Sequence, residues 1–178
     1  PTGGQILVEG EDLMSLDRKA ARQLRTKMQM IFQDPISSLN PRRRVKDIVA
    51  EPLDCWNSAK GEERDRIVFD MLNKVGIDPA VYGNRYARQF SGGQCQRISI
   101  ARSLTMRPKV LICDEVVSAL DVSIQAQILN LLEDLKKEYG LTMLFIAHDL
   151  AVVKNISDRV AVMYLGKLCE IGPSDTLY

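Results

Sequence analysis

Polar residues that could carry chemistry follow three apolar stretches of the sequence. Asp114 and Glu115 follow KVLIC, Gln33 follows KMQMIF, and His148 follows TMLFIA. Asp114 could hold Mg²⁺ through its shell of water molecules, because this small cation prefers hard oxygen ligands. Glu115 could accept a proton from a water molecule directed at the γ-phosphate of a nucleotide. Gln33 could bind the same metal ion or orient the water, and His148 could contact the γ-phosphate and steady the water.

Each of these residues also has an ordinary structural explanation. Two acids after an apolar strand can simply mark where the strand meets solvent, and a glutamine there is usually a surface residue. A single histidine more often makes a structural hydrogen bond than a catalytic one. However, four polar groups of suitable types after apolar strands are a much rarer coincidence than any one of them. Their combination favours phosphoryl transfer.

A second candidate site is the stretch FSGGQCQRISIARSL, which places small and polar residues at the start of an amphipathic helix. Ser91 and Gln94 have the spacing of a capping box, in which each side chain accepts a hydrogen bond from the backbone N–H of the other. Gly92 and Gly93 lack a Cβ atom, so a large anion could approach the free N–H groups of the first turn. An ordinary glycine-containing helix cap is the alternative from these four residues alone.

The candidate residues need a sheet that brings the ends of their strands together. Five short apolar stretches have the length and composition of β-strands. They cover residues 5–9, 27–32, 109–113, 142–147 and 159–164. The third and fourth are apolar almost throughout, which predicts strands buried on both faces of a sheet. Between them, apolar residues from Ile124 to Leu135 recur at helical spacing, so we expect a right-handed strand–helix–strand crossover in a parallel sheet.

The middle of the chain predicts helices rather than strands. Apolar residues recur at helical spacing on both sides of Pro52, and further prolines and glycines interrupt the pattern. We therefore divide the chain into an α/β core of residues 1–34 and 107–178 and an inserted helical subdomain of residues 35–106. Near the end, YLGKLCEIG predicts a hairpin that turns at Leu165 and Gly166.

Composition and charge exclude several classes of protein. The chain has 178 residues, of which 46% are hydrophobic, which is enough for a domain with its own core. Lys and Arg total 24 against 23 for Asp and Glu, so there is no general electrostatic case for binding nucleic acid. The basic run at residues 42–46 is expected to be a solvated face or a partner contact. No apolar run approaches the roughly 18 residues needed to cross a bilayer and no signal peptide opens the chain, so a membrane role would require a partner.

The cysteines indicate a reducing environment. Cys55, Cys95, Cys113 and Cys169 are scattered along the chain without C-x-x-C spacing. This distribution predicts reduced, mostly buried thiols in a cytosolic protein rather than disulfides or a zinc site. Cys113 lies within an apolar stretch, which supports its burial.

Taken in order, these motifs resemble those of the ATP-binding subunits of ABC transporters over essentially the whole chain. Gln33 matches the Q-loop, residues 91–94 match the signature motif, residues 110–115 match the Walker B strand, SALD at 118–121 matches the D-loop, and His148 matches the switch histidine. Stretches such as MQMIFQDPISSLNPR and AHDLAVVKNISDRVAVMYLGK are similar to the ATPase subunits of oligopeptide and dipeptide importers.

The resemblance implies a P-loop NTPase-type α/β core with a mainly parallel sheet, and it implies ATP and Mg²⁺ as cofactors. In this family two ATPase domains meet head to tail, so the signature residues from Ser91 to Gln94 would contact ATP held by a second, identical or paralogous subunit. Asp121 of the D-loop and Gln33 would also contact nucleotide. The other implied partners are membrane permease subunits, bound in part through residues 34–47, and indirectly a solute-binding protein. The expected location is the cytoplasmic face of the cell membrane.

The sequence departs from the family pattern in one major respect and two minor ones. The chain contains no G-x-x-x-x-G-K-[ST] phosphate-binding loop, and we expect that an N-terminal part carrying this loop is missing upstream of Pro1. The chain alone should then bind ATP weakly and hydrolyse it negligibly. Val116 replaces the usual proline after the catalytic glutamate, which frees the φ angle there, and Phe90 replaces the usual leucine before SGGQ. Two alternatives stay open: a soluble ABC ATPase unconnected with transport, and a non-catalytic module that only offers its signature motif to a partner.

Overall fold

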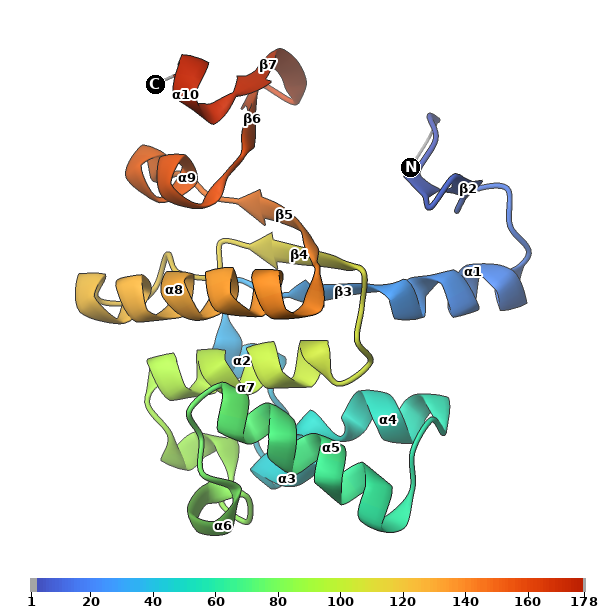
Figure 1. The fold of residues 1–178 in the computed structure, drawn as a ribbon, viewed down its shortest axis with the longest axis vertical. Helices are drawn as coiled ribbons and strands as arrows, with labels where there is room; N and C mark the ends of the chain where they lie inside the picture. Colours follow the sequence, from blue (N-terminus) through green and yellow to red (C-terminus); the bar gives the residue numbers. More distant parts are fainter. Residues whose placement is uncertain (1–2, 178) are drawn as a thin grey trace.

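The structure, a computed structural model, describes residues 3–177 and places a small central sheet above a group of helices (Figure 1). Three parallel strands form this sheet in the order β3-β4-β5. They are β3 (Met28–Ile31), β4 (Val110–Asp114) and β5 (Thr142–Ile146). Val110 pairs with Met28 on one side and with Thr142 on the other, so the three strands begin in line. The predicted α/β class with a parallel sheet is confirmed.

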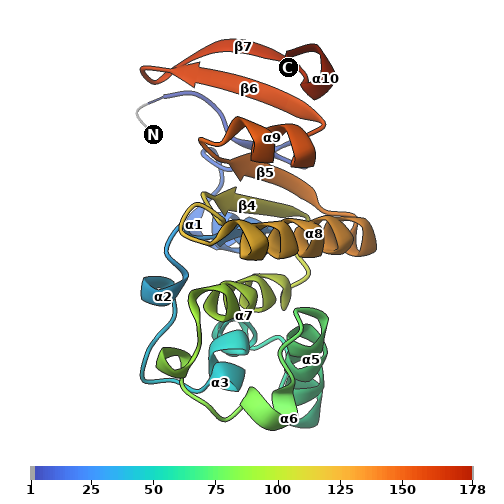
Figure 2. The same ribbon diagram turned by 90° about the vertical axis from the view of Figure 1, so that its left-hand side faces the viewer.

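The predicted helix between two parallel strands is also confirmed. Helix α8 (Val122–Tyr139) joins β4 to β5 and lies along the lower face of the sheet (Figures 1 and 2). Its apolar stripe is buried through Ile128, Leu132 and Leu135. The helix ends at Gly140, which has a φ of 62° and adopts the left-handed conformation that glycine tolerates without strain.

The middle of the chain folds into helices below the sheet, as the sequence pattern predicts (Figure 2). They are α2 (Pro35–Ser38), α3 (Val45–Val49), α4 (Glu51–Trp56), α5 (Gly61–Lys74), α6 (Pro79–Tyr82) and α7 (Gly92–Leu104), with a 3₁₀ turn at Ala87–Gln89. Pro52 does not end a helix but lies in the first turn of α4, where its missing N–H costs no hydrogen bond. Val45, Ile48, Leu72 and Ile98 are completely buried in the core that these helices share.

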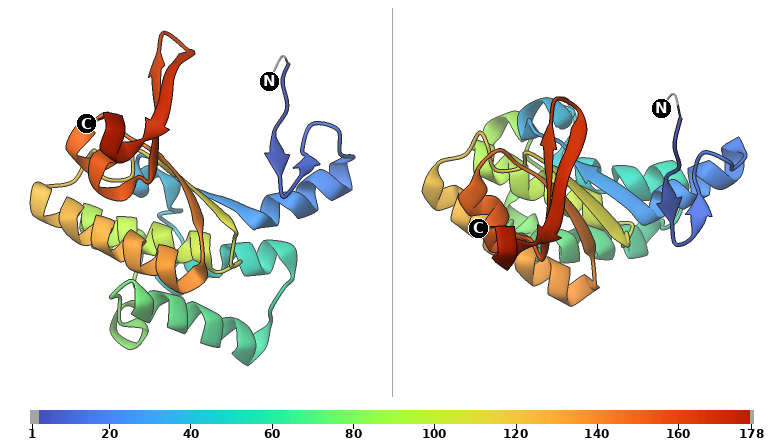
Figure 3. Two further views of the ribbon diagram at one scale, coloured as in Figure 1. Left: turned by 45° about the horizontal axis from the view of Figure 1, so that its top comes forward. Right: turned by 90° about the horizontal axis from the view of Figure 1, so that it is seen from above.

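Two antiparallel hairpins lie beyond the parallel sheet. Strands β1 (Leu7–Val8) and β2 (Glu11–Asp12) form one, and β6 (Arg159–Tyr164) and β7 (Lys167–Pro173) form the other. Figure 3 shows the β6-β7 hairpin projecting from the end of the molecule. Leu165 and Gly166 have φ angles of 47° and 75°, which suits the tight turn that the sequence predicts there. The remaining elements are α1 (Arg18–Leu24), a 3₁₀ turn at Arg25–Lys27, α9 (Leu150–Ile156) and α10 (Ser174–Leu177).

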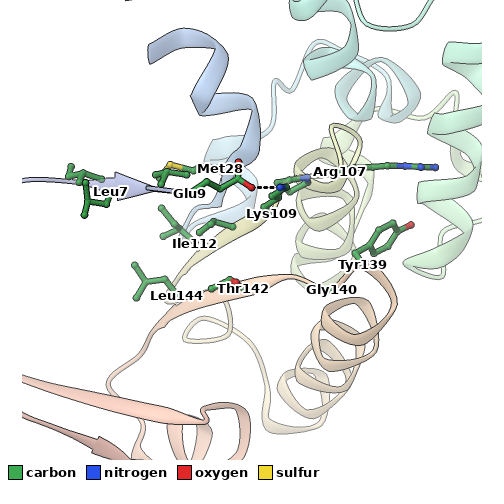
Figure 4. A pocket seen from close by; sticks show the side chains of 14 residues that line it. Leu7, Glu9, Met28, Arg107, Lys109, Ile112, Tyr139, Gly140, Thr142 and Leu144 are labelled. Atoms are coloured by element: carbon green, nitrogen blue, oxygen red, sulfur yellow. Dashed lines mark hydrogen bonds and ion pairs between the residues drawn. The ribbon is translucent and has the colours of Figure 1, made fainter. Parts of the chain in front are cut away.

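Burial of the sheet differs from the prediction at β5. Leu111 and Cys113 on one face of β4 are fully buried, whereas Val110 and Ile112 on its other face are only half-buried, and Leu144 and Ile146 of β5 are 55% and 44% exposed. Helices α7 and α8 cover the lower face of the sheet in Figures 1 and 2. On the other face, a cavity of about 690 Å³ lies beside residues of all three strands (Figure 4). The prediction that β5 is buried on both faces is therefore wrong for the part of the chain that the structure describes.

The prediction of mostly buried thiols holds for two of the four cysteines. Cys95 and Cys113 are buried, and Cys55 and Cys169 are exposed. All four are free thiols. Burial raises the pKa of Cys95, and it raises the pKa of Cys113 to about 12, so these two thiols resist ionisation. Among residues 3–177, no helix has both the length and the apolar character needed to cross a membrane.

Candidate functional site

Three of the predicted site residues meet at one edge of the parallel sheet. The Gln33 side-chain amide donates a hydrogen bond of 2.6 Å from Nε2 to Oε2 of Glu115. On the other oxygen of the same carboxylate, Nδ1 of His148 lies 3.8 Å from Oε1. His148 has a 71% exposed side chain, whereas the Glu115 side chain is 29% exposed, so the carboxylate lies between a glutamine and an open imidazole.

Strand topology explains why residues so distant in sequence meet. The strands β3, β4 and β5 are parallel neighbours, so their carboxyl ends reach the same edge of the sheet. Gln33, Glu115 and His148 each follow one of these strands within two residues of its end. Glu115 also extends the ladder, because its N–H donates a 3.0 Å hydrogen bond to the carbonyl oxygen of Ile146.

The backbone at Glu115 has an unusual conformation. Its φ angle is 48°, in the left-handed region that costs a non-glycine residue about 1–2 kcal/mol. Hydrogen bonds stabilise the turn that follows: the Glu115 carbonyl oxygen accepts from the N–H of Ser118 at 3.1 Å and from its hydroxyl at 2.9 Å. Val116, which stands where the family usually has proline, is buried. A strained residue held this firmly is typical of a functional site.

Asp114 is the last residue of β4 and lies directly before Glu115. Within residues 3–177, no group of three or more His, Cys, Asp or Glu side chains is arranged to enclose a metal ion. Mg²⁺ does not need such a group, because it usually binds one or two protein oxygens together with water and substrate phosphates. The Asp114 carboxylate and the Gln33 amide oxygen fit this requirement, since Gln33 uses only its Nε2 to contact Glu115.

The predicted capping box at the start of α7 is confirmed. The Ser91 hydroxyl oxygen accepts a 3.3 Å hydrogen bond from the Gln94 N–H, and Oε1 of Gln94 accepts a 3.0 Å hydrogen bond from the Ser91 N–H. The N–H groups of Gly92 and Gly93 lie in the first turn and have no acceptor within the helix. The start of α7 therefore presents backbone donors, with the Ser91 hydroxyl proton as a further donor.

The two glycines of this motif differ in what surrounds them. A Cβ atom on Gly93 would lie 2.7 Å from Cγ2 of Ile124 in α8, which is too close for any real contact. A Cβ atom on Gly92 would lie 3.8 Å from the Leu120 side chain, an ordinary van der Waals distance. Gly93 is therefore required for packing of α7 against α8. Only Gly92 is free of this packing constraint.

Asp121, the remaining predicted contact, is the N-cap residue of α8. Its exposed side chain makes no capping hydrogen bond to that helix. In the described part of the chain, no hydrogen bond or ion pair joins Asp121, Ser91 or Gln94 to the carboxylate of Glu115. The structure therefore brings together Gln33, Glu115 and His148, and it leaves the signature residues as a separate group.

The sequence analysis missed a groove of about 410 Å³ between β3, α4 and α7. Its lining includes Phe32, Glu51, Trp56 and Arg102. The basic run at residues 42–46, expected to be a solvated face or a partner contact, contributes two arginines that form hydrogen bonds within the chain. They are Arg43, which lies 3.2 Å from Glu51, and Arg44, which lies 3.2 Å from Asn84. Phe32 is 49% exposed, and no sequence spacing relates it to Trp56, so the groove follows only from the packing of β3 against α4 and α7.

Comparison with known proteins shows the family. A family model described as "ABC transporter" matches residues 1–118. The chain belongs to the ABC transporter family. It is 54% identical over 179 aligned residues to the oligopeptide transport ATP-binding protein OppF of Salmonella typhimurium, covering 99% of this chain and 53% of that protein. It is 53% identical over 178 residues to the dipeptide transport ATP-binding protein DppF of Lactococcus lactis, covering 99% of this chain and 57% of that protein.

Solved structures confirm the fold of this ABC family chain. The structure of cbiO1 from Clostridium perfringens, described as part of the ABC transporter complex cbiONQ, matches with a TM-score of 0.86 and 31% identity over 99% of this chain and 68% of the other. The ATP-binding cassette MJ0796, in a post-hydrolysis state bound to ADP and Pi, matches with a TM-score of 0.84 and 27% identity over 98% of this chain and 75% of the other. The chain spans about half the length of the curated relatives that it matches.

Proposed function

We propose that this ABC family chain belongs to an ATP-hydrolysing subunit that drives the import of oligopeptides or dipeptides. The observation that carries the proposal is the 2.6 Å hydrogen bond between Gln33 and Glu115, with His148 on the other side of the carboxylate. Relatives named as oligopeptide and dipeptide transport ATP-binding proteins support the choice of solute. The proposed cofactors are ATP and Mg²⁺.

In this proposal Glu115 is the general base. Its carboxylate accepts a proton from the attacking water, and the Gln33 amide fixes its orientation through Oε2. His148 is exposed at the same edge and can donate a hydrogen bond to a terminal phosphate oxygen. Asp114 and the Gln33 amide oxygen would hold Mg²⁺, which supplies positive charge against the phosphate oxygens.

In the same proposal, the signature residues 91–94 contact the nucleotide bound by a second subunit, not the one next to Glu115 of their own chain. Within residues 3–177, Ser91 and Gln94 form hydrogen bonds with each other and none with Glu115, which is compatible with a head-to-tail pair of subunits, in which α7 of one covers the ATP of the other. The free N–H groups of Gly92 and Gly93 and the positive end of the α7 dipole favour a phosphate there. Gln94 reinforces this helix start through the capping box, and Asp121 lies at the neighbouring start of α8.

The groove beside Gln33 provides a surface for a permease segment. Phe32, with its 49% exposed side chain, and Trp56 give it an apolar lining, and Glu51 adds a charged rim. Phe32 directly precedes Gln33, so a segment bound in the groove would lie next to the residue that contacts Glu115. Attachment to membrane permease subunits in this way would place the chain at the cytoplasmic face of the membrane.

The decisive experiment uses the full-length protein. We expect Glu115→Gln to lower the rate of phosphate release from ATP by about a hundredfold or more, because general bases contribute on this scale. The matched control is Glu133→Gln on α8, whose carboxylate pairs with Lys136 and Lys137 away from the site, and we expect it to stay within about twofold of wild type. Equal rates for wild type and Glu115→Gln would refute the role of Glu115.

A second measurement separates import from the alternatives. Permease subunits and a peptide-loaded binding protein are added, and the rate of ATP hydrolysis is compared with that of the ATPase alone. An increase supports peptide import, whereas an unchanged rate supports a soluble ABC ATPase. If the full-length protein lacks a phosphate-binding loop and hydrolyses no ATP, the chain is a non-catalytic module that offers only its signature group.

A further inference from the structure

Arg102, in the last turn of α7, contacts the segment that follows Gln33. Its Nη1 donates a 2.7 Å hydrogen bond to the carbonyl oxygen of Ser38, the last residue of α2. Burial lowers the pKa of Arg102, and the charge of Glu51 offsets part of this effect. Removing part of the Arg102 guanidinium from water costs free energy. A charge-assisted hydrogen bond to the Ser38 carbonyl offsets part of this cost, so the contact is structurally significant rather than an incidental surface contact.

Within residues 3–177, the hydrogen bond to Ser38 is one of two that side chains at the end of α7 make to the backbone around Gln33. The Ser103 hydroxyl lies 3.3 Å from the carbonyl oxygen of Met30, which precedes Gln33, and 3.0 Å from the carbonyl oxygen of Ser99 within α7. Its single proton is shared between these two acceptors, which leaves Arg102 as the stronger contact. Side chains from one helical turn thus contact the backbone on both sides of Gln33.

The path from Arg102 to Glu115 is short and made of hydrogen bonds. Ser38 belongs to α2, whose N-cap is Asp34, the residue after Gln33. The N–H of Ser38 donates to the carbonyl oxygen of Asp34 at 3.2 Å, and Gln33 in turn donates to Glu115 at 2.6 Å. Arg102 and Ser38 also line the 410 Å³ groove, so an occupant of the groove would touch this path directly.

We propose that Arg102 is a positioning residue that fixes α2, and through it the Gln33 side chain, relative to the signature helix α7. This inference rests on the proposed function, in which the Gln33–Glu115 hydrogen bond belongs to the catalytic site. Through Arg102, a segment bound in the groove or a shift of α7 would change that hydrogen bond. Arg102 does not touch the reacting atoms and acts only through α2 and Gln33.

The same helix provides a matched control. Arg97 of α7 also donates to a backbone carbonyl, with its Nη1 2.9 Å from the oxygen of Val75, and its Nη2 contacts Gln127 at 3.1 Å. These partners lie at the end of α5 and on α8, away from Gln33. Arg102→Met and Arg97→Met therefore remove similar hydrogen bonds from one helix, and only the first affects α2.

The test measures backbone hydrogen exchange and the Gln33 side-chain amide signal by NMR in the full-length protein, without nucleotide. We expect Arg102→Met to speed exchange at the Ser38 and Leu39 amides by about tenfold and to shift the Gln33 amide signal, because both depend on a fixed α2. Arg102→Lys keeps the charge and one donor, so its shift of the Gln33 signal should be smaller and of the same sign. Arg97→Met should leave both readouts at their wild-type values.

The outcomes separate the positioning role from the proposed function. An unchanged Gln33 signal in both Arg102 variants, or an equal shift in Arg97→Met, would overturn the positioning role. Circular dichroism checks folding, and if Arg102→Met does not fold, Arg102→Lys against Arg97→Lys decides by the same Gln33 signal. No nucleotide enters this experiment and every variant in it keeps Glu115, so a negative NMR result leaves the Glu115→Gln activity test standing, and a negative activity test leaves the NMR result standing.

Discussion

The helical subdomain and the strands after α8 bury their apolar residues to very different extents. In the subdomain, Ile48 and Leu72 are completely inaccessible to solvent. From β5 to β7, by contrast, Leu144 is 55% exposed and Met163 is 68% exposed. The helices share one buried cluster with β3, β4 and α8, whereas the β5 face and the β6-β7 hairpin leave apolar side chains exposed. Apolar sequence alone therefore does not ensure burial, which depends on having a neighbouring layer.

A leucine-to-alanine substitution in each region tests this contrast, and it has the largest effect that we expect. Leu72→Ala removes a fully buried side chain from α5, and we expect it to lower the free energy of unfolding by about 3 kcal/mol. Leu144→Ala removes a half-exposed side chain from β5, and the loss should be below about 1 kcal/mol. Urea unfolding monitored by circular dichroism measures both. Equal losses would show that the two regions are packed alike.

The next prediction concerns the contact between α7 and α8. Gly93→Ala places a methyl group 2.7 Å from Cγ2 of Ile124, and we expect a loss of about 1–3 kcal/mol in the free energy of unfolding, as overpacking typically costs. Gly92→Ala meets only an ordinary contact at 3.8 Å, so its stability should stay within about 0.5 kcal/mol of wild type. Thermal unfolding of the pair gives the answer. A Gly93→Ala variant as stable as wild type would show that α7 and α8 can separate freely.

The smallest expected effect comes from an ion pair within the subdomain. Arg64 of α5 donates to Asp54 of α4 at 2.7 Å and 3.0 Å, which lowers the pKa of Asp54. A carboxylate with a lowered pKa in the folded state stabilises the fold above its unfolded-state pKa, and this contribution disappears as the pH falls through the folded-state pKa. The Asp54 side chain is 38% exposed, so we expect Asp54→Asn to cost less than about 1 kcal/mol at pH 7.

The pH series for this variant provides its own control. The difference in unfolding free energy between wild type and Asp54→Asn should begin to shrink as the pH falls below about 4, where Asp54 of the unfolded chain becomes protonated, and should vanish below the lowered folded-state pKa of Asp54. Urea unfolding at several pH values measures the difference. A difference that stays constant from neutral to strongly acidic pH would show that the charge of Asp54 contributes nothing.

Local spacing was sufficient to predict much of the fold and part of the site. The capping box formed by Ser91 and Gln94, the turn at Leu165 and Gly166, and the crossover helix α8 all agree with the sequence. Each of these features depends on residues only a few positions apart, so the information is contained in a short stretch of chain. The catalytic and binding roles assigned to the site residues stay predictions, and the Glu115→Gln experiment tests the central one.

Features that depend on contacts between residues distant in the sequence could not be predicted from local spacing. The apolar pattern of β5 is the same whether one face of the sheet is covered or both, so its exposure was not predictable. The groove beside Gln33 joins β3, α4 and α7, and no spacing rule relates Phe32 to Trp56 or Arg102. Position 93 likewise needs a glycine because a Cβ atom there would clash with Ile124, which belongs to another helix.

By itself, the sequence determined which side chains follow each strand and which residues begin each helix, because these properties depend on near neighbours and on the periods of helices and strands. Only the tertiary structure decided that Gln33 would donate to Glu115, 82 residues away, and that Arg102 would contact the segment after Gln33. The physical reason is that parallel pairing of β3, β4 and β5 brings their carboxyl ends to one edge, and packing of α7 below that sheet brings distant side chains within hydrogen-bonding distance.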